Sequence, residues 1–156
     1  MKSQSLIFLF LFISIACTNS QKTREDATQG ANKIAEKSKV GTTDDQATNI
    51  RNGKAVFLQY CATCHMVDGS GVRGLQPPLT DPKWISGEEQ FVYILEKGIS
   101  GTIDVNGKQY NNLMPAHKHL TNKEMANVIT YVRKSFGNNF DAVTAKEVAK
   151  IRRSIN

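Results

Sequence analysis

Apolar and polar residues divide the chain into three stretches. Residues 6–15 are almost wholly apolar, residues 18–49 are rich in Gln, Thr, Asn, Asp and Lys and hold no aromatic residue, and residues 50–156 carry apolar residues at regular spacing. The middle stretch is too polar to bury enough surface to offset its chain entropy, so it predicts a flexible tether. The last stretch is long enough for one small domain.

Residues 50–61 repeat apolar positions at three- and four-residue steps, which is the period of an amphipathic α-helix. Ile50, Gly53, Phe57 and Tyr60 share the apolar face. We expect Phe57 and Tyr60 in the core. A glycine inside a helix costs about 1 kcal/mol relative to alanine, and fraying near the helix start is one explanation for Gly53.

Three further helices are predicted by capping boxes, in which Ser or Thr is followed three residues later by Glu and each side chain bonds the backbone N–H of the other. A glycine is a common residue just after a helix. The boxes are Ser86 with Glu89, Thr121 with Glu124 and Thr144 with Glu147, and the first two helices are expected to end at Gly98 and, after Phe136, at Gly137.

A β-hairpin is the one predicted departure from helical structure. Residues alternate on both sides of Asn106 and Gly107, and Asn-Gly is a strong signal for a two-residue turn between antiparallel strands. The predicted fold class is therefore all-α, with three to five helices and a short hairpin near residues 102–110.

The distinctive chemistry of the chain lies in Cys61-Ala62-Thr63-Cys64-His65. Two cysteines at this spacing can each add a thiol across a vinyl group of one haem, and a histidine directly after the second can bind the haem iron. The motif predicts one covalently bound c-type haem per chain, held by Cys61, Cys64 and His65.

Thioredoxin-like redox pairs and zinc sites use the same cysteine spacing. The chain has no second CxxC, so a zinc site would need His117 and His119 as further ligands and would crowd His65 against a cysteine ligand. A structural zinc module is therefore the alternative interpretation, and covalent haem is the main one.

The surroundings of this motif resemble class I monohaem cytochromes c over about residues 50–137. The resemblance implies a small helical domain folded around haem and the activity of a one-electron carrier. It also implies that the helix after Thr121 crosses the first helix closely at Gly53, near Tyr131. The segments that carry it are 53–60, Pro77-Pro78-Leu79, Met114-Pro115, 120–124 and 128–132.

The resemblance and the ligand chemistry together assign Met114 as the second axial ligand. It lies in a loop stiffened by the proline that follows it, far along the chain from His65. Thioether ligation favours ferrous iron and raises the potential relative to two imidazoles. Met66 directly follows His65 and is expected to pack, whereas His117 and His119 are competing ligands.

The loop between the motif and the second predicted helix is rich in Gly and Pro, a composition that allows close wrapping of a flat ligand. In the family, a proline carbonyl of this loop accepts a hydrogen bond from the axial histidine, which assigns that role to Pro77 or Pro78. Arg73 either pairs with a haem propionate or is solvated. Trp84 either packs on the haem edge with its N–H on a propionate or packs in the core.

Residues 1–16 have the features of an export signal, with Lys2 before the apolar run and the small Ala16 after it. The run is too short to span a bilayer comfortably. Ser14-Ile15-Ala16-Cys17 resembles a lipobox, whose cysteine is acylated, although Ser14 departs from the usual aliphatic residue. The same residues also suit ordinary signal peptidase, which would leave a free thiol.

Cysteine use favours lipidation, because haem takes two of the three cysteines and Cys17 would otherwise be an odd thiol in an exported protein. We therefore expect a signal peptide at 1–16, a lipidated N-terminus and tether at 17–49, and a cytochrome c domain at 50–156. The expected location is the bacterial periplasm, anchored to a membrane through Cys17. A soluble periplasmic protein is the alternative.

The formal net charge of +6 is concentrated in the predicted haem domain. Residues 51–156 contain fourteen Lys and Arg against nine Asp and Glu, whereas residues 18–50 contain five of each. A basic rim would steer a redox partner with an acidic docking surface, unless it is only a solvated face or attracts anionic lipid. We expect a monomer that does not bind nucleic acid. The cations near the ligand loop and the helix after it are Lys118, Lys123, Arg133 and Lys134.

These features predict a one-electron carrier, not an enzyme, that passes electrons between periplasmic or membrane redox partners. The alternative is a haem enzyme of peroxidase or nitrite-reducing type, which needs an open iron position and distal acid–base groups. Residues 136–152 also resemble cytochrome domains attached to, or partnered with, copper nitrite reductases and periplasmic alcohol or sugar dehydrogenases.

Overall fold

The computed structural model describes residues 43–156. The expected export signal, the expected lipidation site Cys17 and most of the expected tether lie outside the described residues. Among residues 43–156, no helix has both the length and the apolar character needed to cross a membrane.

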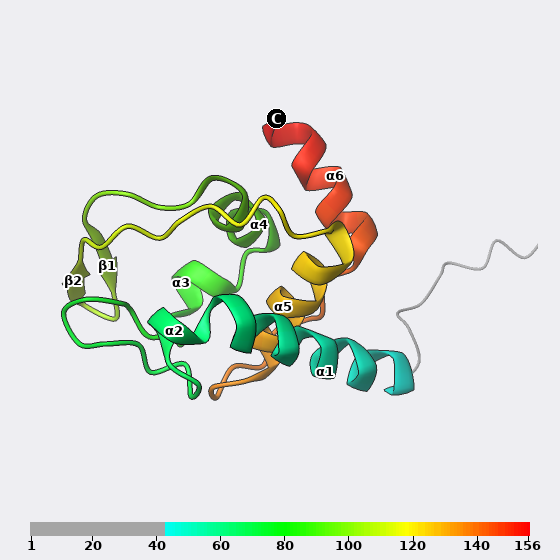
Figure 1. Ribbon diagram of the computed structural model, residues 1–156, viewed down its shortest axis with the longest axis horizontal. Coiled ribbons are helices and arrows are strands. Elements are labelled where there is room, and N and C mark those ends of the chain that lie inside the picture. Colours follow the sequence, from blue (N-terminus) through cyan, green and yellow to red (C-terminus); the bar gives the residue numbers. More distant parts are fainter. Residues whose placement is uncertain (1–42) are drawn as a thin grey trace, which may run out of the picture. The chain divides into compact units, whose positions relative to one another are not determined.

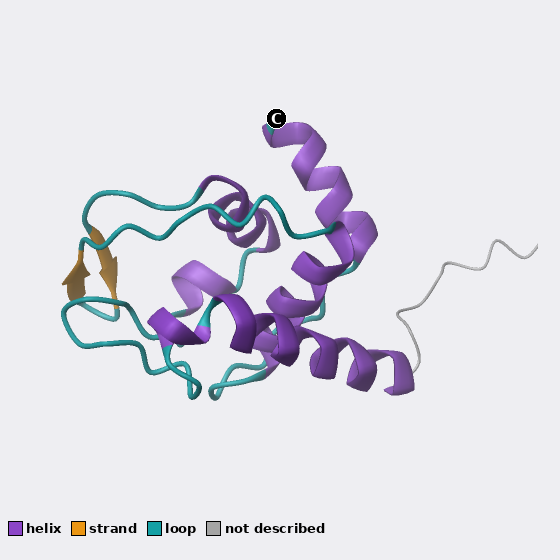
Figure 2. Ribbon diagram, in the orientation of Figure 1, coloured by secondary structure: helices purple, strands orange, loops and turns teal. Residues whose placement is uncertain are grey.

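The described chain forms six helices and one two-stranded antiparallel sheet (Figure 1), which confirms the all-α class and the hairpin. Two of the helices are turns of four residues, too short to show a period, so this part of the chain has more helices than the three to five expected. Loops make up most of the side that holds the hairpin (Figure 2). The elements are α1 (Thr43–Tyr60), α2 (Ala62–His65), α3 (Pro82–Ile85), α4 (Glu88–Lys97), β1 (Ile103–Val105), β2 (Lys108–Tyr110), α5 (Asn122–Lys134) and α6 (Ala145–Ile155).

The packing of α1 against α5 is the most extensive between any two elements. A Cβ atom built on Gly53 would lie 2.0 Å from the carbonyl oxygen of Asn127 and 2.7 Å from Cβ of Tyr131. Only glycine allows the two backbones to come this close, so the predicted crossing is confirmed. Phe57 is fully buried beside it, with its ring 5.3 Å from that of Tyr131. Tyr60, expected in the core, is instead exposed.

Three predicted helix boundaries are wrong. α1 begins at Thr43 rather than near Ile50. α4 is preceded by Gly87, which makes no side-chain cap, and the Ser86 hydroxyl instead donates to the carbonyl of Pro82 at 2.6 Å at the end of α3. α5 ends at Lys134 rather than near Phe136, because Ser135 is already extended, with φ −118° and ψ 176°.

The other two capping boxes are confirmed, and they start the two C-terminal helices. α6 packs on α5 and α4, and its Val148 is fully buried. The hydroxyl of Thr130 on α5 accepts a bond from the backbone N–H of Val143 at 3.0 Å, which fixes the segment that leads into α6.

The hairpin turns at Asn106 and Gly107, which have φ 52° and 72°, as expected for an Asn-Gly turn. The backbone N–H of Asn106 donates to the Asp81 carboxylate at 2.8 Å. Asp81 is also the N-cap of α3. The hairpin is therefore tied to α3, and the two close one side of the region that holds the candidate site.

Candidate functional site

The cysteine motif forms the junction between α1 and α2. Cys61 ends the last turn of α1, with its N–H on the carbonyl of Phe57 at 2.8 Å, and its own carbonyl accepts a bond from the N–H of His65 at 2.9 Å. This helical turn brings Cys61, Cys64 and His65 to the wall of one cavity. Before haem is attached, burial and the neighbouring Cys64 raise the pKa of the Cys61 thiol to about 11, which favours the protonated thiol at neutral pH.

His65 is held in one tautomer by the loop that follows it. Its Nδ1 lies 3.0 Å from the carbonyl oxygen of Pro77, and because that carbonyl can only accept, Nδ1 donates. Pro77 rather than Pro78 therefore makes the contact. Nε2 is left unprotonated, as an iron ligand must be. Burial lowers the pKa of His65 and the Pro77 bond opposes this only partly, which favours the neutral imidazole.

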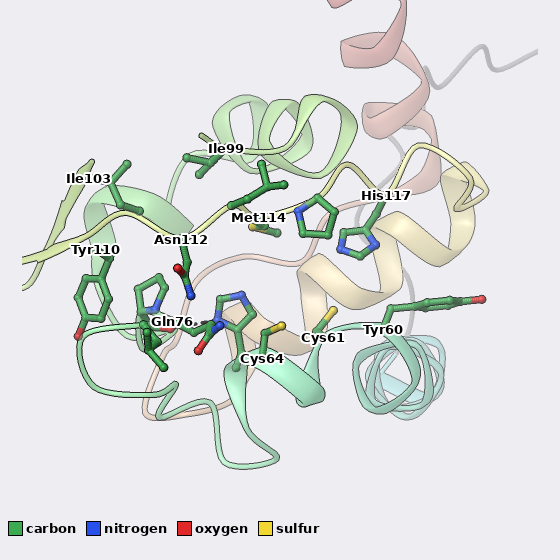
Figure 3. A pocket seen from close by; sticks show the side chains of 15 residues that line it. Tyr60, Cys61, Cys64, Gln76, Ile99, Ile103, Tyr110, Asn112, Met114 and His117 are labelled. Atoms are coloured by element: carbon green, nitrogen blue, oxygen red, sulfur yellow. Dashed lines mark hydrogen bonds between the residues drawn. The ribbon is translucent and has the colours of Figure 1, made fainter. Parts of the chain in front are cut away.

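Three adjoining hollows lie beside the motif, with volumes of about 640, 460 and 290 Å³ when the space open to solvent is included. His65 and Met114 line all three, although they are distant in the chain. Figure 3 shows Cys61 and Cys64 on one side of the largest of these three hollows, called the largest hollow below, and Met114 on the other, with Tyr110 at one end and His117 near the opposite end. Together the hollows form a slot bordered by two thiols, an imidazole and a thioether.

The loop that carries Met114 is fixed to the end of α4. Met114 and Ile99 exchange both backbone hydrogen bonds, at 2.9 and 3.0 Å, and the N–H of His117 donates to the carbonyl of Leu95 at 2.6 Å. Met66, by contrast, is 41% exposed and does not line these hollows, so it is not packed as expected.

The two competing histidines differ in position. His117 lines the largest hollow, whereas His119 does not. His119 packs edge-on against Tyr60, with ring centroids 5.0 Å apart. Nδ1 of His117 is buried and has no hydrogen-bond partner among residues 43–156. Burial, with the charges of His119 and His65, lowers the pKa of His117.

Trp84, Pro78 and Arg73 have different positions around the slot. Trp84 and Pro78 line the second hollow. The indole N–H of Trp84 donates to the carbonyl of Asp104 on β1 at 2.8 Å, so it is committed to the protein rather than directed to a propionate. Arg73 is exposed and lines none of the three hollows.

Three polar residues of the largest hollow were missed in the sequence: Gln76, Tyr110 and Asn112. They come from the loop after the motif, from β2 and from the approach to Met114, and Figure 3 shows them at one end of the hollow. Gln76 directly precedes Pro77 and Asn112 lies two residues before Met114, so closeness to these two residues was the available signal, whereas Tyr110 was recognised only as the end of the hairpin.

The largest hollow has no Lys, Arg, Asp or Glu among the described residues that line it. Lys118 follows His117 and is exposed. Arg133 is buried over the ring of Phe140. The expected basic rim is therefore not formed at the opening by the cations named for it, although Lys118 lies near. Of the other two cations expected in the rim, Lys123 lies beside Asn127 on another face, and Lys134 donates a hydrogen bond to the side chain of Asn139.

The residues of the slot fit a haem. The second hollow has apolar walls suited to a macrocycle, from Ile85 on α3, Phe91 and Ile94 on α4, and Ile103 and Val105 on β1. The donor set of thiols, imidazole and thioether is the one that c-type haem uses. A fold with a slot of this composition defines a haem-binding helical domain.

The Cytochrome c family model matches residues 50–136, and the chain belongs to this family. Cytochrome c-552 of Thermus thermophilus is 32% identical over 111 residues, which cover 65% of this chain and 84% of that protein. The protein therefore carries electrons through a covalently bound haem c that contains iron, and the zinc interpretation is wrong.

Two dehydrogenase subunits are also similar to this chain. The cytochrome c subunit of a quinone alcohol dehydrogenase from Gluconobacter oxydans is 34% identical over 136 residues, which cover 76% of this chain and 27% of the subunit. The gluconate 2-dehydrogenase cytochrome c subunit of Pantoea cypripedii is 33% identical over 127 residues, covering 73% and 28%. The chain thus spans less than a third of the length of either subunit.

Proposed function

We propose that the protein is a one-electron carrier whose haem is joined to Cys61 and Cys64 by thioether bonds and bound through iron by His65 and Met114. The observation that supports this most directly is that His65 and Met114, from distant parts of the chain, line the same three hollows beside both cysteines. When bound, the haem supplies a ferric/ferrous couple.

The residues around the slot set the conditions for that couple. Pro77 keeps Nε2 of His65 unprotonated, and the bridge to Ile99 fixes the backbone of Met114. If His65 and Met114 both bind the iron, it would have no open position for a substrate. The apolar walls keep water away from the slot, and a low local dielectric disfavours the more charged ferric state.

The polar end of the largest hollow is suited to the haem carboxylates. Gln76, Tyr110 and Asn112 carry amide and hydroxyl donors there, and such groups can bond carboxylates without a cation. We therefore assign the contacts with the haem carboxylates to these three residues instead of Arg73 and Trp84.

Electron exchange with a protein partner would take place at the opening of the largest hollow. Leu75 and Leu113 line it and are 51% and 72% exposed. An uncharged, partly apolar opening favours contact with an apolar patch of a redox protein, with Lys118 as the nearby cation for an acidic group. The similarity to dehydrogenase cytochrome subunits makes a dehydrogenase a candidate donor. Attachment to a bacterial membrane through a lipidated Cys17, facing the periplasm, would place the carrier beside such a partner.

Ferric absorption spectra recorded with and without cyanide test the ligand assignment. The wild-type protein should show the weak red band of iron bonded to a thioether and should bind cyanide slowly. Met114→Ala should lose the band, bind cyanide at once and have a lower reduction potential, whereas His117→Ala should keep the band. An enzyme with an open iron position, the alternative function, would instead bind cyanide at once in the wild type.

A further inference from the structure

Arg152 on α6 reaches the loop that carries Met114 from outside the slot. Its guanidinium donates from Nε to the Glu96 carboxylate at 2.7 Å, from Nη1 to the Asn122 side-chain oxygen at 2.8 Å, and from Nη2 to the backbone carbonyl of Lys118 at 3.1 Å. These acceptors lie on the last turn of α4, at the start of α5, and in the segment between Met114 and α5. One side chain therefore joins four parts of the fold.

Two other attachments of this loop are made between Met114 and His117, just before Lys118. Met114 is bonded to Ile99, and His117 is bonded to Leu95. Leu95 is the neighbour of Glu96 in α4. Arg152 therefore adds a second connection from α4, through α6, to the residue that directly follows His117. Its bond to the carbonyl of Lys118 attaches α6 directly to the backbone of this loop.

The bonds of Arg152 to Glu96 and Asn122 are partly buried, whereas its bond to the Lys118 carbonyl is exposed. Its side chain is 16% exposed and that of Glu96 is 10% exposed. Charge-assisted bonds in such surroundings are stronger than exposed ion pairs and are weakly screened by salt. The planar guanidinium can hold its three acceptors in one fixed geometry, which a lysine ammonium cannot reproduce.

We propose that Arg152 is a positioning residue that keeps the Met114 loop closed over the slot, so that the thioether remains on iron. The inference rests on the proposed ligation by Met114. It assigns a role in the electron-transfer site to α6, which lies beyond residues 50–136 matched by the family.

Cyanide binding by the ferric holoprotein tests this role, because cyanide must displace Met114. Arg152→Gln should bind cyanide about tenfold faster than the wild type, because the loss of one bond to a charged group has an effect of about this size. The red absorption band of thioether-bound iron should also weaken in this variant. Arg152→Lys should be intermediate. Arg153→Gln removes the same charge from the next, exposed residue of α6 and should behave as wild type.

A lower thermal midpoint of Arg152→Gln with a wild-type cyanide rate and band would show a merely structural role and would overturn the inference. If Arg152→Gln does not fold, Asn122→Ala removes one of the three bonds and should still accelerate cyanide binding, and an unchanged rate overturns the inference. If the wild-type protein itself binds cyanide at once, the Met114 assignment and this inference are both overturned. The cyanide rate of the wild type therefore distinguishes failure of the ligand assignment from failure of the Arg152 role alone.

Discussion

Replacing Gly53 with alanine tests the helix crossing that positions the cysteine motif. The added methyl group would lie 2.0 Å from the Asn127 carbonyl oxygen, 2.6 Å from its carbonyl carbon and 2.7 Å from Cβ of Tyr131, whereas ordinary contact begins near 3.4 Å. Two of these atoms are backbone, which cannot turn aside as a flexible side chain would. α5 would have to move away from α1 by more than an ångström.

The net change in the free energy of unfolding is the balance between helix propensity and overpacking. Alanine gains about 1 kcal/mol of helix propensity over glycine in a helix interior. Overpacking in a dense core costs about 1–3 kcal/mol and occasionally more. Because the obstruction is backbone, we expect a cost at the upper end of this range, about 3 kcal/mol, and after the gain of about 1 kcal/mol a net loss of about 2 kcal/mol in the free energy of unfolding.

Guanidinium denaturation of the haem-loaded protein measures this loss. Asn52→Ala is the matched control, because it places alanine at the adjacent, exposed position of α1 and should be neutral or stabilising by a few tenths of a kcal/mol. If Gly53→Ala proved as stable as wild type, or more stable, the close crossing of α1 and α5 would be refuted.

Two further predictions concern the supports of the slot. Trp84→Phe removes the bond to the Asp104 carbonyl and should lower the free energy of unfolding by about 1–2 kcal/mol without changing the reduction potential; a shifted potential would show that the indole N–H acts on the haem. Bonds from the Thr121 hydroxyl and backbone N–H lower the pKa of Glu124 from its ordinary value of 4.5. The Glu124 carboxylate therefore stabilises the folded protein fully above pH 4.5, and this stabilisation is lost as pH falls through the lower pKa of the folded state. Glu124→Gln should therefore show a smaller loss of thermal midpoint on acidification over this range, and an equal loss would contradict the role of this cap.

Local patterns predicted the parts of the fold that depend on neighbouring residues. The capping boxes at Thr121 and Thr144 and the hairpin at Asn106 were confirmed because each is completed within a few residues. The box at Ser86 failed because α3, a single turn with its own cap at Asp81, takes up that serine. Such a short helix has no period to recognise.

Contacts between distant segments could not be predicted from local patterns. Which proline contacts His65 depends on how the turn between Val72 and Gln76 directs the following carbonyls. Arg133 was assigned to a basic rim from its charge, although it lies on the buried side of α5. The three acceptors of Arg152 likewise meet only after α4, α5 and α6 have packed.

The central claim is the covalent attachment of haem at Cys61 and Cys64, and mass spectrometry of the mature protein tests it most directly. Protein made with a working haem maturation system should have the mass of the polypeptide plus one haem, and the same spectrum would report whether Cys17 carries lipid. The double variant Cys61→Ala and Cys64→Ala should carry no covalent haem. A wild-type mass that equals the polypeptide, with or without lipid, would contradict the account.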